Sequence, residues 1–167
     1  MILVLECIAL CIIFTLIILP AQYKDPLVMI MSYPPEIIKR VEQLPQYAGC
    51  IKERKKKHIS KKIFGIFFFA IVLAIISYLS GCRTFAASFF HVFMLFFVVN
   101  IYDLLVLDWG IFCHSKKLRI PGTEDMEKEY TDYLFHVKGA CIGIALGLVV
   151  ALLSGCIVHM LIGLGHL

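Results

Sequence analysis

The chain has 167 residues, of which 60% are hydrophobic and only 17% are charged. An average soluble domain is about half apolar and about a quarter charged. This balance excludes a disordered chain, a disulfide-stapled miniprotein and an ordinary cytosolic enzyme, and it predicts a small integral membrane protein with a single domain over residues 1–167.

Four apolar stretches are long enough to cross the hydrocarbon layer of about 30 Å, which takes about 20 helical residues. They lie at about 1–20, 63–80, 84–112 and 139–164. Lipid cannot satisfy backbone N–H and C=O groups, so each stretch is expected to be a helix that pairs its own backbone. The predicted fold is therefore an all-α, integral membrane four-helix bundle, with polar connections at 21–62 and 113–138.

The basic residues predict the orientation of this bundle. Ten of the 16 Lys and Arg residues lie in 21–62, five lie in 113–138, and Arg83 alone lies between the second and third helices. Cytoplasmic connections carry an excess of Lys and Arg, so both long connections are expected in the cytoplasm and both chain ends outside. The first stretch lacks the basic start of a signal peptide and is expected to remain as a helix. The expected location is a cell membrane that the chain crosses several times.

The first connection is expected to hold a short amphipathic helix and a basic run. A proline pair precedes residues 36–43, where Ile37, Ile38 and Val41 share one helical face that would lie against the membrane surface or the bundle. The run Lys52–Lys62 is expected to anchor the cytoplasmic side and to attract anionic lipid. Nucleic acid is not an expected partner, because the run has no interleaved aromatic residues and no recognisable binding motif.

The seven cysteines do not predict a disulfide framework. None forms a C-x-x-C pair, their number is odd, and several lie inside predicted helices, where thiols act as small apolar packing groups. The same pattern argues against membrane quinone reductases that generate disulfides, since these need paired external cysteines.

Small residues recur every four positions along the fourth predicted helix. The series is Gly139, Gly143, Gly147, Ala151 and Gly155, and it continues through His159 to Gly163. Small residues at this spacing let two helix backbones approach closely, and such packing drives helix association in lipid. The series therefore predicts a helix–helix seam, within the chain or between subunits, and a homo-oligomer or a membrane partner is the corresponding expectation.

Two histidines lie near the predicted external ends of the third and fourth helices. His91 is about seven residues inside its helix, His159 is a few residues inside, and Glu6 lies at a similar depth. Ionisable groups at membrane depth are costly and tend to face the bundle interior or a functional cavity. One hypothesis is a haem or metal ion bound by His91 and His159. The alternative is that each histidine bonds a neighbouring helix or the headgroup region.

The third predicted helix ends in a polar segment on the cytoplasmic side. With the α-helical rotation of about 100° per residue, Asn100, Asp103 and His114 fall near one face, whereas Asp108 lies off it. A carboxylate at the depth of Asp103 needs partners, because it lies below the headgroups.

The second connection adds further polar groups near the same surface. Pro121-Gly122 predicts a turn, and Thr123 is expected to cap a short polar helix that leads towards the fourth span. The candidate catalytic residues are Asp103, Asp108, His114, Glu124 and His136. Carboxylates can bind a cation or act as a general base, and nearby cations suit a phosphate group. A capped surface helix beside an ion pair explains the same residues without catalysis.

Part of this region resembles a known group of proteins. Between 103 and 139 the resemblance rests on Asp108-Trp109, the runs 113–116 and 119–124, and Phe135-His136 with Lys138-Gly139. In these residues the chain is similar to an uncharacterised family of small four-helix membrane proteins from Gram-positive bacteria. The resemblance covers about a fifth of the chain. It implies a bacterial four-helix membrane protein and no particular activity.

Three functions stay open at this point. The first is a non-enzymatic subunit or accessory protein that associates through the small-residue face of the fourth helix, because no complete catalytic motif is present. The second is a membrane enzyme that acts on a lipid or phosphate-bearing substrate at the cytoplasmic surface. The third is a haem- or metal-binding membrane protein.

Overall fold

The computed structural model describes residues 1–165, except for the side chain of Ala48. Over that part of the chain every regular element is helical and there is no strand. Four helices are long and apolar enough to cross a membrane. The predicted all-α class, with four helices that are able to span a membrane, is therefore confirmed.

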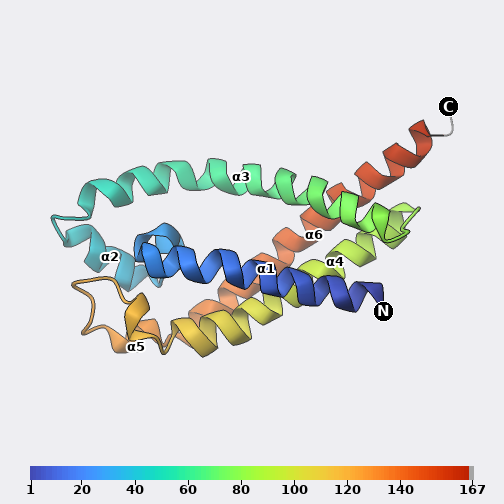
Figure 1. Cartoon of the computed structure of the whole chain (residues 1–167). Coiled ribbons are helices and arrows are strands. Elements are labelled where there is room, and N and C mark those ends of the chain that lie inside the picture. Colours follow the sequence, from blue (N-terminus) through green and yellow to red (C-terminus); the bar gives the residue numbers. More distant parts are fainter. Residues whose placement is uncertain (166–167) are drawn as a thin grey trace.

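The long helices are α1 (Ile2–Lys24), α3 (Ala48–Leu79), α4 (Phe85–Tyr102) and α6 (Tyr133–Leu164). A π-helix, η2 (Asp103–Phe112), continues α4 without a break. The shorter elements are η1 (Pro26–Ser32), α2 (Pro35–Gln43), η3 (Lys116–Leu118) and α5 (Glu127–Tyr130). The long helices run alongside one another, with η1, α2, η3, α5 and the start of α3 at one end, which we call the polar end (Figure 1). The start of α1, the α3–α4 turn and the last turns of α6 lie at the opposite end.

Two helices extend well beyond the apolar stretches that predicted them. α3 begins at Ala48 rather than near 63, so the basic run Lys52–Lys62 is helical and continuous with the span. α6 begins at Tyr133 rather than near 139. Hydropathy marks the length that contacts lipid, whereas a helix continues as long as its backbone pairs, and Lys, Arg and Glu are good helix formers.

The bundle is held together mainly by α6, which packs along α4 and α3, while α1 packs on α4. The small-residue seam accounts for the close approach of α6 to α4. A Cβ added at Gly147 would lie 2.6 Å from the ring of Phe96, and one added at Gly155 would lie 2.9 Å from the ring of Phe85. The middle of the predicted seam is therefore filled by α4 of the same chain. Towards its ends, a Cβ added at Gly139 or Gly163 would meet no side chain or neighbouring helix of residues 1–165 within 4 Å, so these two positions are open.

Buried serines add polar contacts between the long helices. The Ser77 hydroxyl donates to the Ser88 hydroxyl at 2.9 Å and joins α3 to α4, and Ser154 on α6 donates to the Ala70 carbonyl of α3 at 2.9 Å. An apolar core lies beside these contacts in the middle of the bundle. It contains Ala70, Leu73, Val92, Leu95, Val150 and Ala151.

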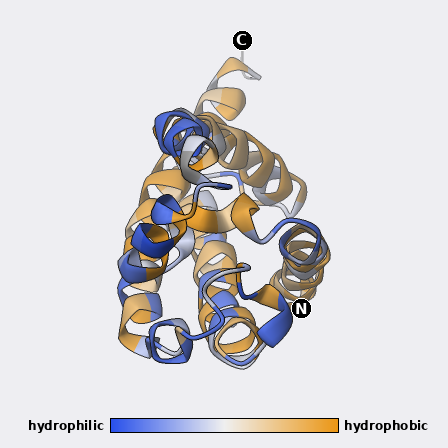
Figure 2. Ribbon diagram, turned by 90° about the vertical axis from the view of Figure 1, so that its left-hand side faces the viewer, coloured by the Kyte–Doolittle hydropathy of each residue, from blue (hydrophilic) through white to orange (hydrophobic). Residues whose placement is uncertain are grey.

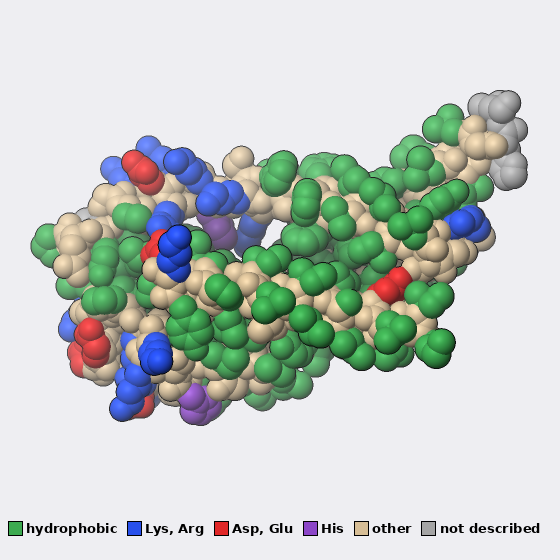
Figure 3. Space-filling view, viewed as in Figure 1, with side chains coloured by type: hydrophobic (Ala, Val, Ile, Leu, Met, Phe, Trp, Pro, Cys, Tyr) green, Lys and Arg blue, Asp and Glu red, His purple; other side chains and the backbone are tan. Residues whose placement is uncertain are grey.

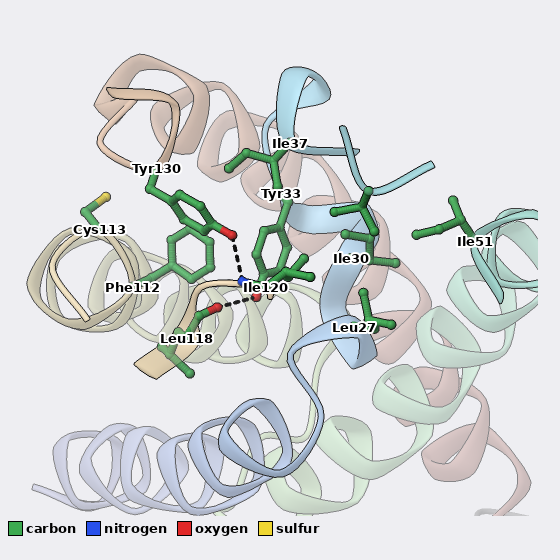
Figure 4. Close-up of a cluster of buried hydrophobic side chains, with 11 residues drawn as sticks. Leu27, Ile30, Tyr33, Ile37, Ile51, Phe112, Cys113, Leu118, Ile120 and Tyr130 are labelled. Atoms are coloured by element: carbon green, nitrogen blue, oxygen red, sulfur yellow. Dashed lines mark hydrogen bonds between the residues drawn. The ribbon is translucent and has the colours of Figure 1, made fainter. Parts of the chain in front are cut away.

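The polar end has a separate apolar core (Figure 4). It consists of Leu27, Ile30, Tyr33, Ile37, Val41, Ile51, Phe112, Cys113, Leu118, Ile120 and Tyr130. The predicted amphipathic helix at 36–43 is confirmed as α2, and its apolar face packs into this core through Ile37 and Val41. Hydrophilic residues gather on the elements around this core, whereas the long helices behind them are largely hydrophobic (Figure 2).

Hydrogen bonds fix the loop that closes this core. The Tyr33 hydroxyl donates to the Leu118 carbonyl at 3.2 Å, and the backbone N–H of Ile120 donates to the Tyr130 hydroxyl at 2.9 Å (Figure 4). Burial raises the pKa of Tyr33 well above its usual value, so this hydroxyl stays a donor. Thr123 is fully buried and donates to the Ile120 carbonyl at 2.7 Å. The predicted capping role of Thr123 is therefore wrong, because its hydroxyl pairs inside the loop.

Candidate functional site

A cavity of about 460 Å³ lies at the polar end between α1, η1, η2 and α6. Its apolar wall includes Phe14 and Ile18 from α1 and Leu104 and Leu107 from η2. Its polar wall contains Asn100, Asp103, Asp108, His136, Lys62 and Lys138. We call this the Asp–His cavity. Its lining is amphiphilic, with apolar groups over one part and charged groups over another.

The π-helix explains why both aspartates reach this cavity. In a π-helix each N–H bonds to the carbonyl five residues earlier, as in the 2.9 Å bond from Cys113 to Asp108. Residues five apart, such as Asp103 and Asp108, then lie nearly above one another, whereas in an α-helix they would be about 140° apart. The prediction that Asp108 lies off the face of Asp103 is wrong, because it assumed an α-helical rotation throughout.

Asp108 meets His136 across the boundary between η2 and α6. The Oδ2 atom of Asp108 lies 3.1 Å from Nδ1 of His136, whose side chain is only 4% exposed. The edge of the imidazole ring packs against Phe112, with the ring centroids 5.3 Å apart. The pair thus holds a carboxylate and an imidazole rigidly in one wall of the cavity.

The same wall contains buried polar atoms that form no hydrogen bond with the described residues. Within residues 1–165, the buried atoms Oδ1 of Asn100 and Nε2 of His136 have no hydrogen-bond partner. Asp103 also lines the cavity and forms no ion pair with any described residue. An unmet buried polar group costs about 1–3 kcal/mol, so a wall of this kind favours a polar ligand.

The other two candidate catalytic residues lie outside the cavity. His114 is exposed, and its Nδ1 donates to the Trp109 carbonyl at 2.8 Å. Glu124 is also exposed and accepts two bonds from the backbone N–H of Gly122, at 2.9 and 3.0 Å. Its own backbone N–H and that of Gly122 lower the pKa of Glu124. Gly122, with φ +92°, confirms the predicted turn. The cavity therefore brings together Asp103, Asp108 and His136, and neither His114 nor Glu124.

Several cavity residues were not predicted from the sequence. Lys138 is only two positions from His136, and this proximity was an available signal. Lys62 and the α1 side chains carry no comparable pattern, because only the packing of α1 and α3 around η1 places them at the cavity.

A second cavity of about 710 Å³ adjoins the first, between η1 and the start of α3. Its charged lining contains Asp25, Glu53, Arg54, Lys57, Lys61 and Lys62, and His58 lies among them. We call it the basic groove. Arg54 donates to the Leu27 carbonyl at 2.6 Å and to Asp25 at 2.8 Å, and so fastens α3 to η1. Lys and Arg side chains gather at one end of the hollow between α3 and α1, towards the polar end (Figure 3).

The basic groove and the Asp–His cavity share part of their lining. Met29, Met31, Ser32 and Lys62 line both. In the described part of the chain, Lys57, Lys61 and Lys62 form no ion pair. Cations without partners therefore lie beside an amphiphilic cavity.

The two histidines of the cofactor hypothesis have different surroundings at the opposite end. His91 is 10% exposed and contacts Glu6 on α1 and Cys82 in the α3–α4 turn. His159 on α6 is exposed. Among residues 1–165 no group of three or more His, Cys, Asp or Glu side chains is arranged to hold a metal ion. Both ring nitrogens of His91 are occupied by side chains of its own chain.

No protein-family model, curated protein or solved structure matches this chain. The resemblance of residues 103–139 to a family of Gram-positive membrane proteins stays a prediction. The functional conclusion depends on the geometry of the polar end.

Proposed function

We propose that this chain is a multi-pass membrane protein that binds a phosphate-bearing amphiphile, such as an anionic phospholipid, at its polar end. The observation that carries the proposal is the shared lining of the basic groove and the Asp–His cavity. A ligand with a phosphate group and an acyl chain has both kinds of surface that this pair of cavities offers.

The charge distribution supports a cytoplasmic position for the polar end. Fifteen of the 16 Lys and Arg residues lie in 21–62 and 113–138, the two segments nearest the polar end, and Arg83 alone lies in the turn at the opposite end. The positive-inside bias favours a polar end in the cytoplasm, and we infer that both chain ends lie outside. Anionic lipid headgroups lie at that depth and attract a basic segment with about 1 kcal/mol per Lys or Arg.

The headgroup phosphate would lie in the basic groove. Arg54 is already paired with Asp25, so the cations that remain for a phosphate are Lys57, Lys61 and Lys62. Lys62 also lines the Asp–His cavity, and it therefore marks the boundary between the two parts of the ligand. The acyl chain would continue along the apolar wall formed by Phe14 and Ile18.

Two matched pairs of lysines test this proposal. K61Q/K62Q removes two cations from the groove, and K116Q/K117Q removes two exposed cations at the same end but outside both cavities. With the full chain in nanodiscs that contain phosphatidylglycerol or phosphatidylcholine, bound lipid is quantified by mass spectrometry. K61Q/K62Q should bind phosphatidylglycerol about thirtyfold more weakly, from about 1 kcal/mol per lysine. Equal loss in both pairs, or loss in neither, would contradict a specific site.

A second candidate function rests on the contact between Asp108 and His136. A carboxylate that holds an imidazole in a cavity wall is the arrangement of a general acid–base pair, and it supports an enzyme that acts on the bound headgroup. Incubation with phosphatidylglycerol vesicles, followed by mass spectrometry of the lipid, tests it. Headgroup cleavage or transfer that is lost in H136Q, while lipid binding persists, supports the enzyme. Unchanged lipid with the wild-type chain contradicts it.

A further inference from the structure

At the end opposite the polar end, a thiol contacts an imidazole, and the imidazole contacts a carboxylate. The Cys82 Sγ atom lies 3.2 Å from Nδ1 of His91, and Nε2 of His91 lies 2.6 Å from Oε2 of Glu6. The hydroxyl of Ser80 donates to the other carboxylate oxygen of Glu6. We call the three residues the Cys82–His91–Glu6 triad.

The order of these contacts sets the protonation of the ring. A carboxylate only accepts hydrogen bonds, so the Nε2 atom that faces Glu6 carries the proton. Nδ1 is then the unprotonated nitrogen, and it is the atom that faces the Cys82 thiol. This is the arrangement in which an imidazole accepts the proton of a nucleophile while a third group orients it.

Three separate elements place the triad. Glu6 lies in the second turn of α1, His91 in the second turn of α4, and Cys82 in the turn between α3 and α4. Gly81 ends α3 with φ +93°, and the backbone N–H of Cys82 donates to the Ser77 carbonyl at 3.1 Å. A left-handed glycine after a helix turns the chain back over its last turn. Cys82 is thereby held against α4.

The surroundings of the triad are partly screened from solvent. His91 is 10% exposed and Glu6 is 19% exposed. Arg83 also lies beside the triad, and its guanidinium donates to the Cys82 carbonyl at 3.3 Å. Beside Glu6 on α1 lies the half-buried thiol of Cys7, and within residues 1–165 α6 contributes no ion pair or hydrogen bond to the triad.

We propose that the Cys82–His91–Glu6 triad is a nucleophilic thiol site that accepts an acyl group from an ester at the external surface of the membrane, opposite the polar end. The Cys82 sulfur would attack the ester carbonyl while His91 takes the thiol proton. The carbon–sulfur bond of a thioester forms, the carbon–oxygen bond breaks, and the alcohol leaves with the proton from His91. Water or another alcohol then cleaves the thioester and restores the thiol, with no change in oxidation state.

The apolar surface near the triad favours an ester with a hydrocarbon chain. The exposed side chains close to it in sequence include Ile2, Leu5, Leu79 and Phe85. An acyl chain dissolved in the membrane would contact these groups and present its carbonyl at the level of the turn. Glu6 acts as a positioning residue for His91, and only Cys82 and His91 would touch the reacting atoms.

The full chain in mild detergent, treated with p-nitrophenyl acetate, tests this inference. Nitrophenolate release gives the rate, and peptide mass spectrometry identifies which cysteines are acetylated. Cys82 should be acetylated at least tenfold faster than Cys50, a half-buried thiol at the polar end of the same molecules. A rate at Cys82 that does not exceed the rate at Cys50 would overturn the proposal, and this comparison needs no variant.

Two variants then distinguish the role of His91 as the proton acceptor from the role of Glu6 as the positioning residue. H91Q should slow acetylation of Cys82 about a hundredfold, because it removes the proton acceptor. E6Q should slow it less, because the ring loses the carboxylate that orients it but keeps its proton acceptor, and E6D, which keeps a carboxylate, should recover part of the rate. C156S is the matched control and should react as the wild type does at Cys82. If H91Q leaves the rate at Cys82 unchanged while gel filtration shows a folded chain, the triad is not a nucleophilic site.

Discussion

The two ends of the molecule place their polar side chains by different means. At the opposite end, Glu6 and His91 lie in the second turns of ordinary α-helices, and Cys82 lies in the turn between α3 and α4. At the polar end, Asp103 and Asp108 share a cavity wall only because η2 is a π-helix. At the opposite end, regular helices bring only a few groups to the same depth. At the polar end, the irregular segment η2 packs on a separate apolar core and helps to line a cavity.

The largest expected effect comes from the polar-end core. Ile37→Ala should lower the free energy of unfolding by about 2–5 kcal/mol, because it leaves a cavity at a fully buried position. The measurement is denaturant unfolding in detergent micelles, followed by circular dichroism. Ile12→Ala on the exposed face of α1 is the matched control and should change stability little. Equal effects in both variants would mean that the polar end has no core of its own.

The seam between α6 and α4 should give the next largest effect. Gly147→Leu should cost about 1–3 kcal/mol, since a Cβ there already meets the ring of Phe96. Gly139→Leu, at an open position of the same seam, is the control and should be tolerated. The same unfolding assay applies, and a larger loss in Gly139→Leu would show that the seam packs between subunits instead.

A smaller effect is expected from the polar contact between α6 and α3. Ser154→Ala should cost about 0.6 kcal/mol, the average for an interhelical hydrogen bond in a membrane protein. Ser60→Ala, at an exposed position of α3, should be neutral. If urea titrations show no difference between the two variants, the Ser154 hydroxyl does not contribute to the bundle.

The smallest effect concerns the exposed turn at the polar end. Backbone N–H groups lower the pKa of Glu124, so its contribution to stability is present above the unfolded pKa near 4.5 and is lost as the pH falls through the folded value. Thermal unfolding of wild type and E124Q should therefore differ slightly above about pH 5 and converge as the pH falls from there through the folded pKa. A difference that grows as the pH falls would contradict the turn geometry.

Hydropathy and charge predicted the part of the fold that lipid imposes. Four spans, the amphipathic helix that begins at Pro35 and the turn at Gly122 follow from local patterns, because each depends on neighbours in the sequence. The helix starts at Ala48 and Tyr133 were missed, since a helix continues past the point where lipid contact ends.

Part of each candidate site was predicted from the sequence, because depth along the helices brings Asp103, Asp108 and His136 to one end. Glu6 and His91 were expected at one level, and the structure brings them together. Cys82 was missed because its position depends on the left-handed conformation of Gly81. Asp108 was misplaced because no local pattern indicates that η2 departs from α-helical rotation.

The most direct test of the lipid site is an experimental structure of the full chain extracted with its native lipids. We predict density for a phosphate between Lys57, Lys61 and Lys62, continued by an acyl chain along Phe14 and Ile18 in the Asp–His cavity. Lipid density confined to the outer faces of α1, α3, α4 and α6, with only water in the groove and the cavity, would contradict it.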